Sequence, residues 1–131
     1  MKFNYEHLDT TKRIHEYIKL VYQITDQFPK TEKFGLVMQA RRSAASVLLN
    51  LAEGSARSSR PEFARFLNIA IGSLVETDAT LKLAVTLTLI PEEQRKRPDD
   101  IVQETFYKLV ALKKSQLKKQ TPKPTISTNE A

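Results

Sequence analysis

Charged and polar side chains interrupt the most apolar part of the chain, residues 41–76 (RRSAASVLLNLAEGSARSSRPEFARFLNIAIGSLVE). A helix that is apolar on nearly every side is normally buried, and a charged residue is almost never fully buried unless it is paired. The polar residues therefore either pair inside the fold, or line a contact between subunits or a central channel. They are Arg42, Asn50, Glu53, Arg65 and Glu76.

The other residues with catalytic potential are poorly spaced for chemistry. Neither His7 nor His15 follows a Glu by three residues, as a di-iron bundle requires. Arg13 precedes His15 by two residues, which is the wrong spacing for a helical nuclease of the HEPN type. The three glycines are too far apart for a phosphate loop, and the lack of Cys excludes thiolate sites. We therefore predict a protein that is not an enzyme, with no metal and no cofactor.

Basic residues are concentrated at two places. The net charge is +6, and residues 113–131 contain five Lys and one Glu, which leaves only about +2 for the rest. Such segments attract phosphate through counterion release, although lysines near a helix end also favour the helix dipole and solubility. The candidates for nucleic-acid binding are Arg57, Arg60, Lys113, Lys114, Lys118 and Lys119.

Apolar spacing predicts an all-α fold of four helices, over about 9–28, 32–53, 61–88 and from near Pro98 onward. Residues 1–119 are expected to form one bundle domain. The polar segment 120–131, with two Pro, is expected to be a disordered tail. No apolar run approaches the ~20 residues of a membrane span and no apolar signal region opens the chain, so we expect a cytoplasmic protein.

The two central helices are predicted to form a hairpin that closes around residues 54–61. Gly54 is expected to end the first helix in a left-handed conformation. Pro61 fits the first turn of the second helix, which Ser58 or Ser59 can cap. With the turn centred near residues 57 and 58, opposed positions should have numbers that sum to about 115.

This register predicts which residues meet across the hairpin. Gly72 should face Ser43 and Ala44 and allow the helices to approach closely, because Gly inside a helix otherwise costs about 1 kcal/mol relative to Ala. The register also predicts two structural ion pairs, Arg42 with Glu76 and Glu53 with Arg65.

Apolar residues exceed what one hairpin partner can cover, which favours oligomerisation. The surplus is around Val47, Leu48 and Leu51. Aromatic residues could stack on bases, but their helical spacing alongside leucines assigns them to the core or to a subunit interface. These are Phe63, Phe66, Phe106 and Tyr107.

The run from Gly35 to Glu76 resembles the core of the four-helix-bundle proteins encoded in bacterial 23S rRNA intervening sequences, a family that also includes accessory proteins of diversity-generating retroelements. The matching residues are Arg42, Ser46, Asn50, Ala52, Glu53, Gly54, Arg57, Glu62, Arg65, Phe66, Leu67, Ala70, Gly72, Ser73 and Glu76. Leu48 departs from the pattern, where the family commonly has Pro. The resemblance implies an antiparallel up-down bundle that assembles as a homopentameric barrel and binds nucleic acid.

We therefore expect a non-enzymatic, homo-oligomeric bundle that binds RNA or DNA through basic surface patches. The alternative is a protein-interaction scaffold without direct nucleic-acid binding, for example an accessory subunit of a reverse transcriptase or of ribosome-associated machinery. In that case the basic residues only keep the protein in solution.

Overall fold

The computed structural model describes residues 1–119, in which all regular elements are helical. The four main helices are α1 (Asp9–Thr25), α2 (Leu36–Ser55), α3 (Arg60–Thr86) and α4 (Lys96–Lys119). Three short 3-10 helices accompany them: η1 (Asn4–His7), η2 (Lys30–Glu32) and η3 (Glu92–Arg95). The predicted all-α fold of four helices is confirmed, and the predicted tail lies outside the described residues.

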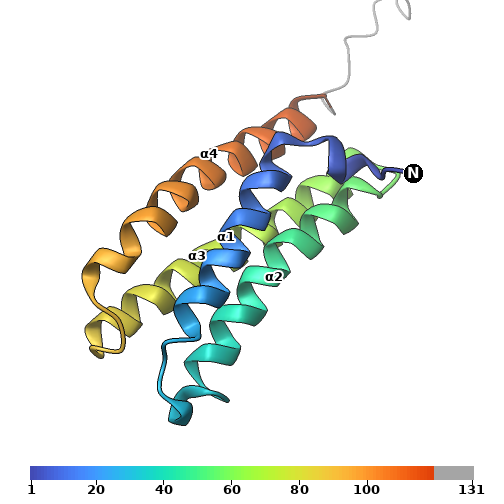
Figure 1. The fold of residues 1–131 in the computed structure, drawn as a ribbon. Helices are drawn as coiled ribbons and strands as arrows, with labels where there is room; N and C mark the ends of the chain where they lie inside the picture. The colour runs from blue at the N-terminus through green and yellow to red at the C-terminus, as the bar shows by residue number, and fades with distance from the viewer. Residues whose placement is uncertain (120–131) are drawn as a thin grey trace, which may run out of the picture.

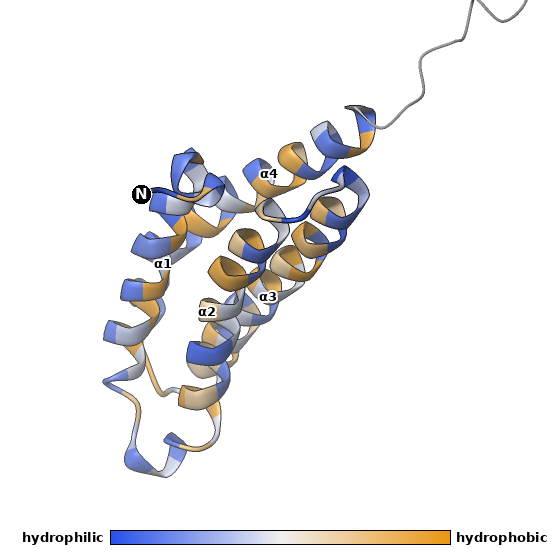
Figure 2. Ribbon diagram, turned by 90° about the vertical axis from the view of Figure 1, so that its right-hand side faces the viewer, coloured by the Kyte–Doolittle hydropathy of each residue, from blue (hydrophilic) through white to orange (hydrophobic). Residues whose placement is uncertain are grey.

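The helices form a bundle in which α1 packs against α2 and α4, and α3 packs against the same two neighbours. Each helix in turn carries the chain from one end of the bundle to the other (Figure 1). Figure 2 shows α1 hydrophilic on its outer side and hydrophobic on the side that faces the other helices. The fully buried side chains include Ile14, Tyr17, Val21, Val47, Leu51, Leu67, Leu74 and Leu109. Within residues 1–119, no helix is long and apolar enough to cross a membrane.

The start of α3 follows the predicted signals. The Ser59 hydroxyl accepts a hydrogen bond from the backbone N–H of Glu62 at 3.2 Å, and Pro61 lies in the first helical turn. A serine in this position satisfies one of the backbone donors that a helix start leaves unpaired. The turn between α2 and α3 is therefore short and well capped, and it holds the arginines of this region at one end of the bundle.

The register of the hairpin differs from the prediction by about one helical turn. The hydroxyls of Ser46 and Ser73 lie 2.9 Å apart, and those of Ser43 and Thr77 lie 2.6 Å apart. The numbers of these pairs sum to 119 and 120, rather than to about 115. Side chains on a helix lean toward its N-terminus, so the residue that covers a given spot lies about one position further along the chain. On two antiparallel helices this lean raises the sum by about two, which is part of the difference.

The close approach between α2 and α3 occurs at Gly54 and not at Gly72. A Cβ atom at Gly54 would lie 2.6 Å from Phe66 Cβ and 3.0 Å from Phe63 Cδ1, whereas a Cβ at Gly72 would meet nothing within 4 Å. Gly54 is also not a left-handed cap, because it lies inside α2 and no described glycine has a positive φ. Both glycine predictions were therefore wrong. Gly54 serves as a contact point within the hairpin.

Tyr17 places a phenol in the centre of the bundle. Its side chain is fully buried, and among the described residues its hydroxyl has no hydrogen-bond partner. Burial raises the pKa of this hydroxyl above its ordinary value of 10.0, and the negative charges of Asp78 and Asp99 raise it further. The folded protein therefore keeps Tyr17 protonated at a pH at which the unfolded chain ionises it.

Tyr17→Phe is expected to raise the free energy of unfolding by about 1 to 3 kcal/mol, because it removes a buried hydroxyl without a partner. Above about pH 10 the Tyr17 hydroxyl is ionised in the unfolded chain but still protonated in the folded protein. The free energy of unfolding of the parent should therefore fall with rising pH, by up to about 1.4 kcal/mol per pH unit. The variant should lack this contribution. Chemical denaturation at about pH 7 and about pH 11 measures both effects. Tyr107→Phe, at an exposed position, is the control and should change neither; a loss of stability in Tyr17→Phe at neutral pH would contradict the prediction.

Candidate nucleic-acid interface

One end of the bundle gathers the two basic groups that are far apart in the sequence. The turn between α2 and α3 and the C-terminal end of α4 lie at the same end of the molecule (Figure 1). Next to this end a hydrogen bond links α3 with α4, since Lys113 Nζ donates to Asn68 Oδ1 at 3.0 Å. We call this region the basic end. It contains Arg57, Arg60, Arg65, Lys113, Lys114 and Lys118.

The arginines of the turn are held in place by carboxylates and by an aromatic ring. Arg57 pairs with Glu53 at 2.6 Å, and Arg65 pairs with Glu62 at 3.1 Å. The guanidinium groups of Arg57 and Arg65 also lie over the ring of Phe66, at 4.7 and 4.5 Å from its centroid. The hydrogen bond from Arg65 lowers the pKa of Glu62. These contacts orient both guanidinium groups, while the carboxylates offset part of their charge.

The predicted ion pair between Glu53 and Arg65 was wrong. Both residues pair with partners three or four positions away in the sequence, Glu53 with Arg57 and Arg65 with Glu62. Glu62 and Arg65 are neighbours on one turn of α3, and Arg57 lies just past the end of α2 within reach of Glu53, so neither pair has to cross the hairpin. All four side chains are solvent-exposed to a large degree, so the pairs orient charge at the surface more than they hold the hairpin together.

The second predicted pair, Arg42 with Glu76, is also absent from the ion pairs of the described residues. Glu76 instead accepts a hydrogen bond from Gln39 at 3.3 Å, and Arg42 is exposed on the outer side of α2. The numbers of Gln39 and Glu76 sum to 115, so this contact follows the predicted register, but it uses Gln39 and leaves the exposed Arg42 out. Asn50, the remaining polar residue of this region, donates to the backbone oxygen of Ser46 at 2.9 Å.

The lysines of α4 carry the least compensated charge. Residues 105–119 contain five Lys and neither Asp nor Glu. Lys114 and Lys118 are exposed, and Lys113 is half-buried beside Asn68. Lys119 ends α4, and its side chain lies outside what the structure describes. Arg60 is exposed at the first position of α3. Positive charge at the basic end therefore comes mainly from α4.

The four aromatic residues that the sequence assigned to the core or an interface differ in how deeply they are buried. Phe66 is buried under two guanidinium groups, and Phe63 and Phe106 are half-buried against the core. Tyr107 is 70% exposed. The sequence carried a signal for this exposure, because Tyr107 lies four, seven and eleven residues before Ala111, Lys114 and Lys118, spacings that place residues on one helical face.

Comparison with known proteins agrees with the fold and with this arrangement of elements. A model of the 23S rRNA-intervening sequence protein family matches residues 6–111. The chain belongs to this family. A search of curated proteins found no match.

A solved structure supports the fold of this 23S rRNA-intervening sequence family member. It is a protein with unknown function from the S23 ribosomal protein family of Bacteroides thetaiotaomicron. The two chains are 24% identical with a TM-score of 0.71, and the match covers 80% of this chain and 98% of the other. At this identity the likeness shows the fold alone. Two residues that carried the sequence resemblance, Gly54 and Phe66, pack against each other between α2 and α3, where a Cβ at Gly54 would lie 2.6 Å from Phe66 Cβ.

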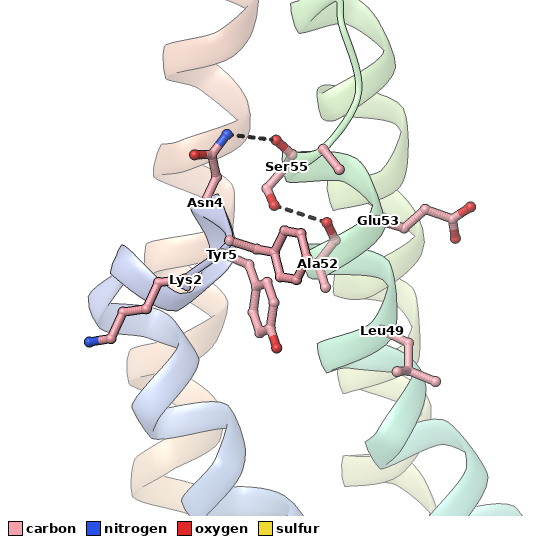
Figure 3. Close-up of a pocket in the computed structure, with 9 residues that line it drawn as sticks. Lys2, Asn4, Tyr5, Leu49, Ala52, Glu53 and Ser55 are labelled. Atoms are coloured by element: carbon pink, nitrogen blue, oxygen red, sulfur yellow. Dashed lines mark hydrogen bonds between the residues drawn. The ribbon is translucent and has the colours of Figure 1, made fainter.

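The family member also has an apolar hollow of about 500 Å³ between its N-terminal segment and α2 (Figure 3). Phe3 and Leu49 are 61% and 63% exposed there, and Asn4 Nδ2 donates to the backbone oxygen of Ser55 at 3.4 Å. The lining residues are Lys2, Phe3, Asn4, Tyr5, Leu49, Ala52, Glu53, Ser55 and Ala56. An open, mainly apolar hollow suits an apolar side chain from another protein surface better than it suits a charged ligand.

The exposed apolar residues of α2 are not the ones that the sequence predicted. Val47 and Leu51 are fully buried inside the bundle, so they are core residues and cannot drive oligomerisation. Met38 and Leu49 are the large apolar residues that α2 exposes. The prediction misplaced the exposed stripe because two inner neighbours, α1 and α3, cover α2 and not one alone.

Proposed function

We propose that this protein is a non-enzymatic, oligomeric helical-bundle protein that binds nucleic acid, RNA or DNA, through its basic end. The observation that carries the proposal is the meeting of two basic groups at one end of the bundle, the arginines of the turn and the lysines of α4. About fifty residues of sequence separate these groups. Their convergence gives a phosphate backbone several cations within one surface.

The character of this surface supports electrostatic binding without base-specific contacts. Exposed lysines attract phosphate as point charges, and oriented arginines can contact phosphate oxygens in a fork geometry. Neutralising phosphates releases counterions, so affinity depends steeply on salt. In an oligomer the surface repeats, and several weak contacts act together on one nucleic acid.

Titration of labelled RNA and of duplex DNA at about 50 and 200 mM salt tests the proposal. If about five cations contact phosphates, the affinity should fall by about 10²- to 10³-fold between these conditions, since each contact adds about 0.7 to 0.9 to the salt slope. Absence of binding to both nucleic acids at the lower salt concentration would overturn the proposal.

We further propose that the helices form an antiparallel up-down unit, and that this unit assembles as a homopentameric barrel. The family resemblance supports this assembly, as do large apolar side chains on the outer surfaces of α2 and α3. These are Met38, Leu49, Ile69, Val75 and Leu83. Together, on two helices that pack against each other, these side chains would give an apolar surface to another copy of the chain.

Light scattering coupled to size exclusion measures the assembly directly. Five chains of 15.0 kDa give an expected mass of about 75 kDa. Leu49→Asp, which puts a charge on the apolar surface, should lower the mass if this surface lies between subunits. Glu93→Asp, at an exposed position in η3, should leave the mass unchanged. A mass of one chain for the parent protein would contradict the assembly.

A second function is favoured by the apolar hollow beside Phe3 and Leu49. It is a protein-interaction scaffold, such as an accessory subunit of a reverse transcriptase or of ribosome-associated machinery. This function predicts no nucleic-acid binding by the isolated protein at either salt concentration. The titration described above therefore separates the two functions.

A further inference from the structure

The outer side of α4 carries an aromatic residue in line with exposed lysines. Residues four, seven and eleven positions apart lie on one face of a helix, and the four residues at these positions are all exposed. We call them the α4 stripe: Tyr107, Ala111, Lys114 and Lys118. With a rise of about 1.5 Å per residue, Lys114 and Lys118 lie about 10 and 16 Å along the helix from Tyr107.

The Tyr107 ring is supported from one side and open to solvent. It meets the ring of Phe106 edge to face, with centroids 5.7 Å apart and an interplanar angle of 80°. Phe106 itself is packed against the core, so it holds its neighbour in place. Tyr107 remains 70% exposed. Other exposed aromatics are used differently, since Arg41 lies over the Tyr22 ring at 4.5 Å and Lys33 over the Phe34 ring at 5.4 Å.

The charge along the stripe has one sign from Tyr107 to the end of α4. Residues 105–119 contain five Lys and no carboxylate. The nearest acidic residue of α4, Glu104, is paired with Arg13 at 2.9 Å and with Lys108 at 3.4 Å. A phosphate chain that follows the stripe therefore meets cations with little repulsion from the same helix.

We propose that the α4 stripe binds single-stranded nucleic acid, with a base stacked on Tyr107 and phosphates near Lys114 and Lys118. The inference rests on the proposed function and specifies its ligand. An aromatic ring beside a row of cations is the combination by which proteins bind single strands. In a duplex the flat faces of the bases are already stacked on each other, so an exposed tyrosine can stack only on an unpaired base.

Two variants separate stacking from charge. Tyr107→Ala should weaken binding of fluorescein-labelled oligouridine by roughly 5- to 100-fold, the range for loss of one stacked base, with no change in the salt slope. Lys114→Gln with Lys118→Gln should lower the salt slope by about 1.4, since each single-strand contact adds about 0.7. Tyr107→Phe keeps the ring and should keep the affinity. Phe34→Ala removes an exposed aromatic beside a lysine at the other end of the bundle, and it should have no effect.

Tyrosine emission gives a second measure, because the chain has four Tyr and no Trp. Oligouridine should quench emission of the parent protein, and it should quench Tyr107→Phe much less. Scattering mass and thermal unfolding of each variant are recorded alongside, and both should match the parent.

Three results would overturn the inference. The first is that Tyr107→Ala and the parent bind oligouridine with equal affinity. The second is that the parent binds an RNA duplex of equal length at least as tightly as it binds oligouridine. The third is that Tyr107→Ala changes the oligomer mass, which would place the ring between subunits. In the first two cases the parent still binds nucleic acid and the proposed function stands. Failure of the parent to bind either RNA removes the proposed function as well.

Discussion

Gly54→Val is expected to lower the free energy of unfolding by about 3 kcal/mol, the upper end of the usual cost of overpacking a core. A Cβ at this position would lie 2.6 Å from Phe66 Cβ, an atom that cannot rotate away because it is attached to the backbone of α3. Relief therefore requires α2 and α3 to separate. For a chain of this size the midpoint of thermal unfolding should fall by about 10 °C, which calorimetry or circular dichroism measures.

Gly72→Val is the matched control for this substitution. Gly72 lies inside α3, and a Cβ there would meet nothing within 4 Å. Valine also has a somewhat better helix propensity than glycine, so stability should stay within about 0.5 kcal/mol of the parent. If both substitutions lowered the free energy of unfolding equally, valine would be destabilising in the helices of this protein in general. That result would contradict the close contact at Gly54.

Replacing Lys113, Lys114 and Lys118 together by Gln is expected to weaken RNA binding by about 10²-fold at about 0.1 M salt. Each lost phosphate contact removes about 0.7 to 0.9 from the salt slope, so the slope should fall by about 2 to 3. The substitutions keep side chains of similar length, and Gln at position 113 can still donate to Asn68. Affinity measured across a series of salt concentrations gives both quantities.

A second triple variant controls for the loss of net charge. Lys19, Lys30 and Lys33 are exposed and lie on α1 and near η2, away from the basic end. Their replacement by Gln changes the net charge from +6 to +3, as the first triple variant does. It should leave the salt slope nearly unchanged. Similar losses in the two variants would mean that binding depends on overall charge and not on the basic end.

The structure gives Arg57 and Arg65 a different role from the one that the sequence predicted for Arg65. The sequence treated Arg65 as a structural partner of Glu53, whereas its guanidinium lies with that of Arg57 over Phe66 at the surface. Both arginines are oriented by carboxylates close in sequence. The family model and the solved relative identify the bundle, and neither assigns a role to these residues.

The sequence by itself determined the four helices, the serine cap of α3 and the family. These features depend on interactions over a few residues, namely apolar periodicity, capping and turn chemistry, or on a pattern that spans the whole hairpin. The predicted helix ends differ from the observed ones by a few residues at most places, because helix ends depend on packing against the next element. Ser59 was predictable for the same local reason: its hydroxyl bonds a backbone group three residues away.

Only the tertiary structure decided which residues meet across the bundle. The hydroxyl contacts across the hairpin fall at sums of 119 and 120, the close contact lies at Gly54 and not at Gly72, and Arg42 stays at the surface. The meeting of the turn arginines with the α4 lysines, and the exposure of Tyr107, likewise depend on how helices far apart in sequence pack. Helical periodicity gives the face of each residue but not the neighbour that covers it, so the candidate interface became visible only in the assembled bundle.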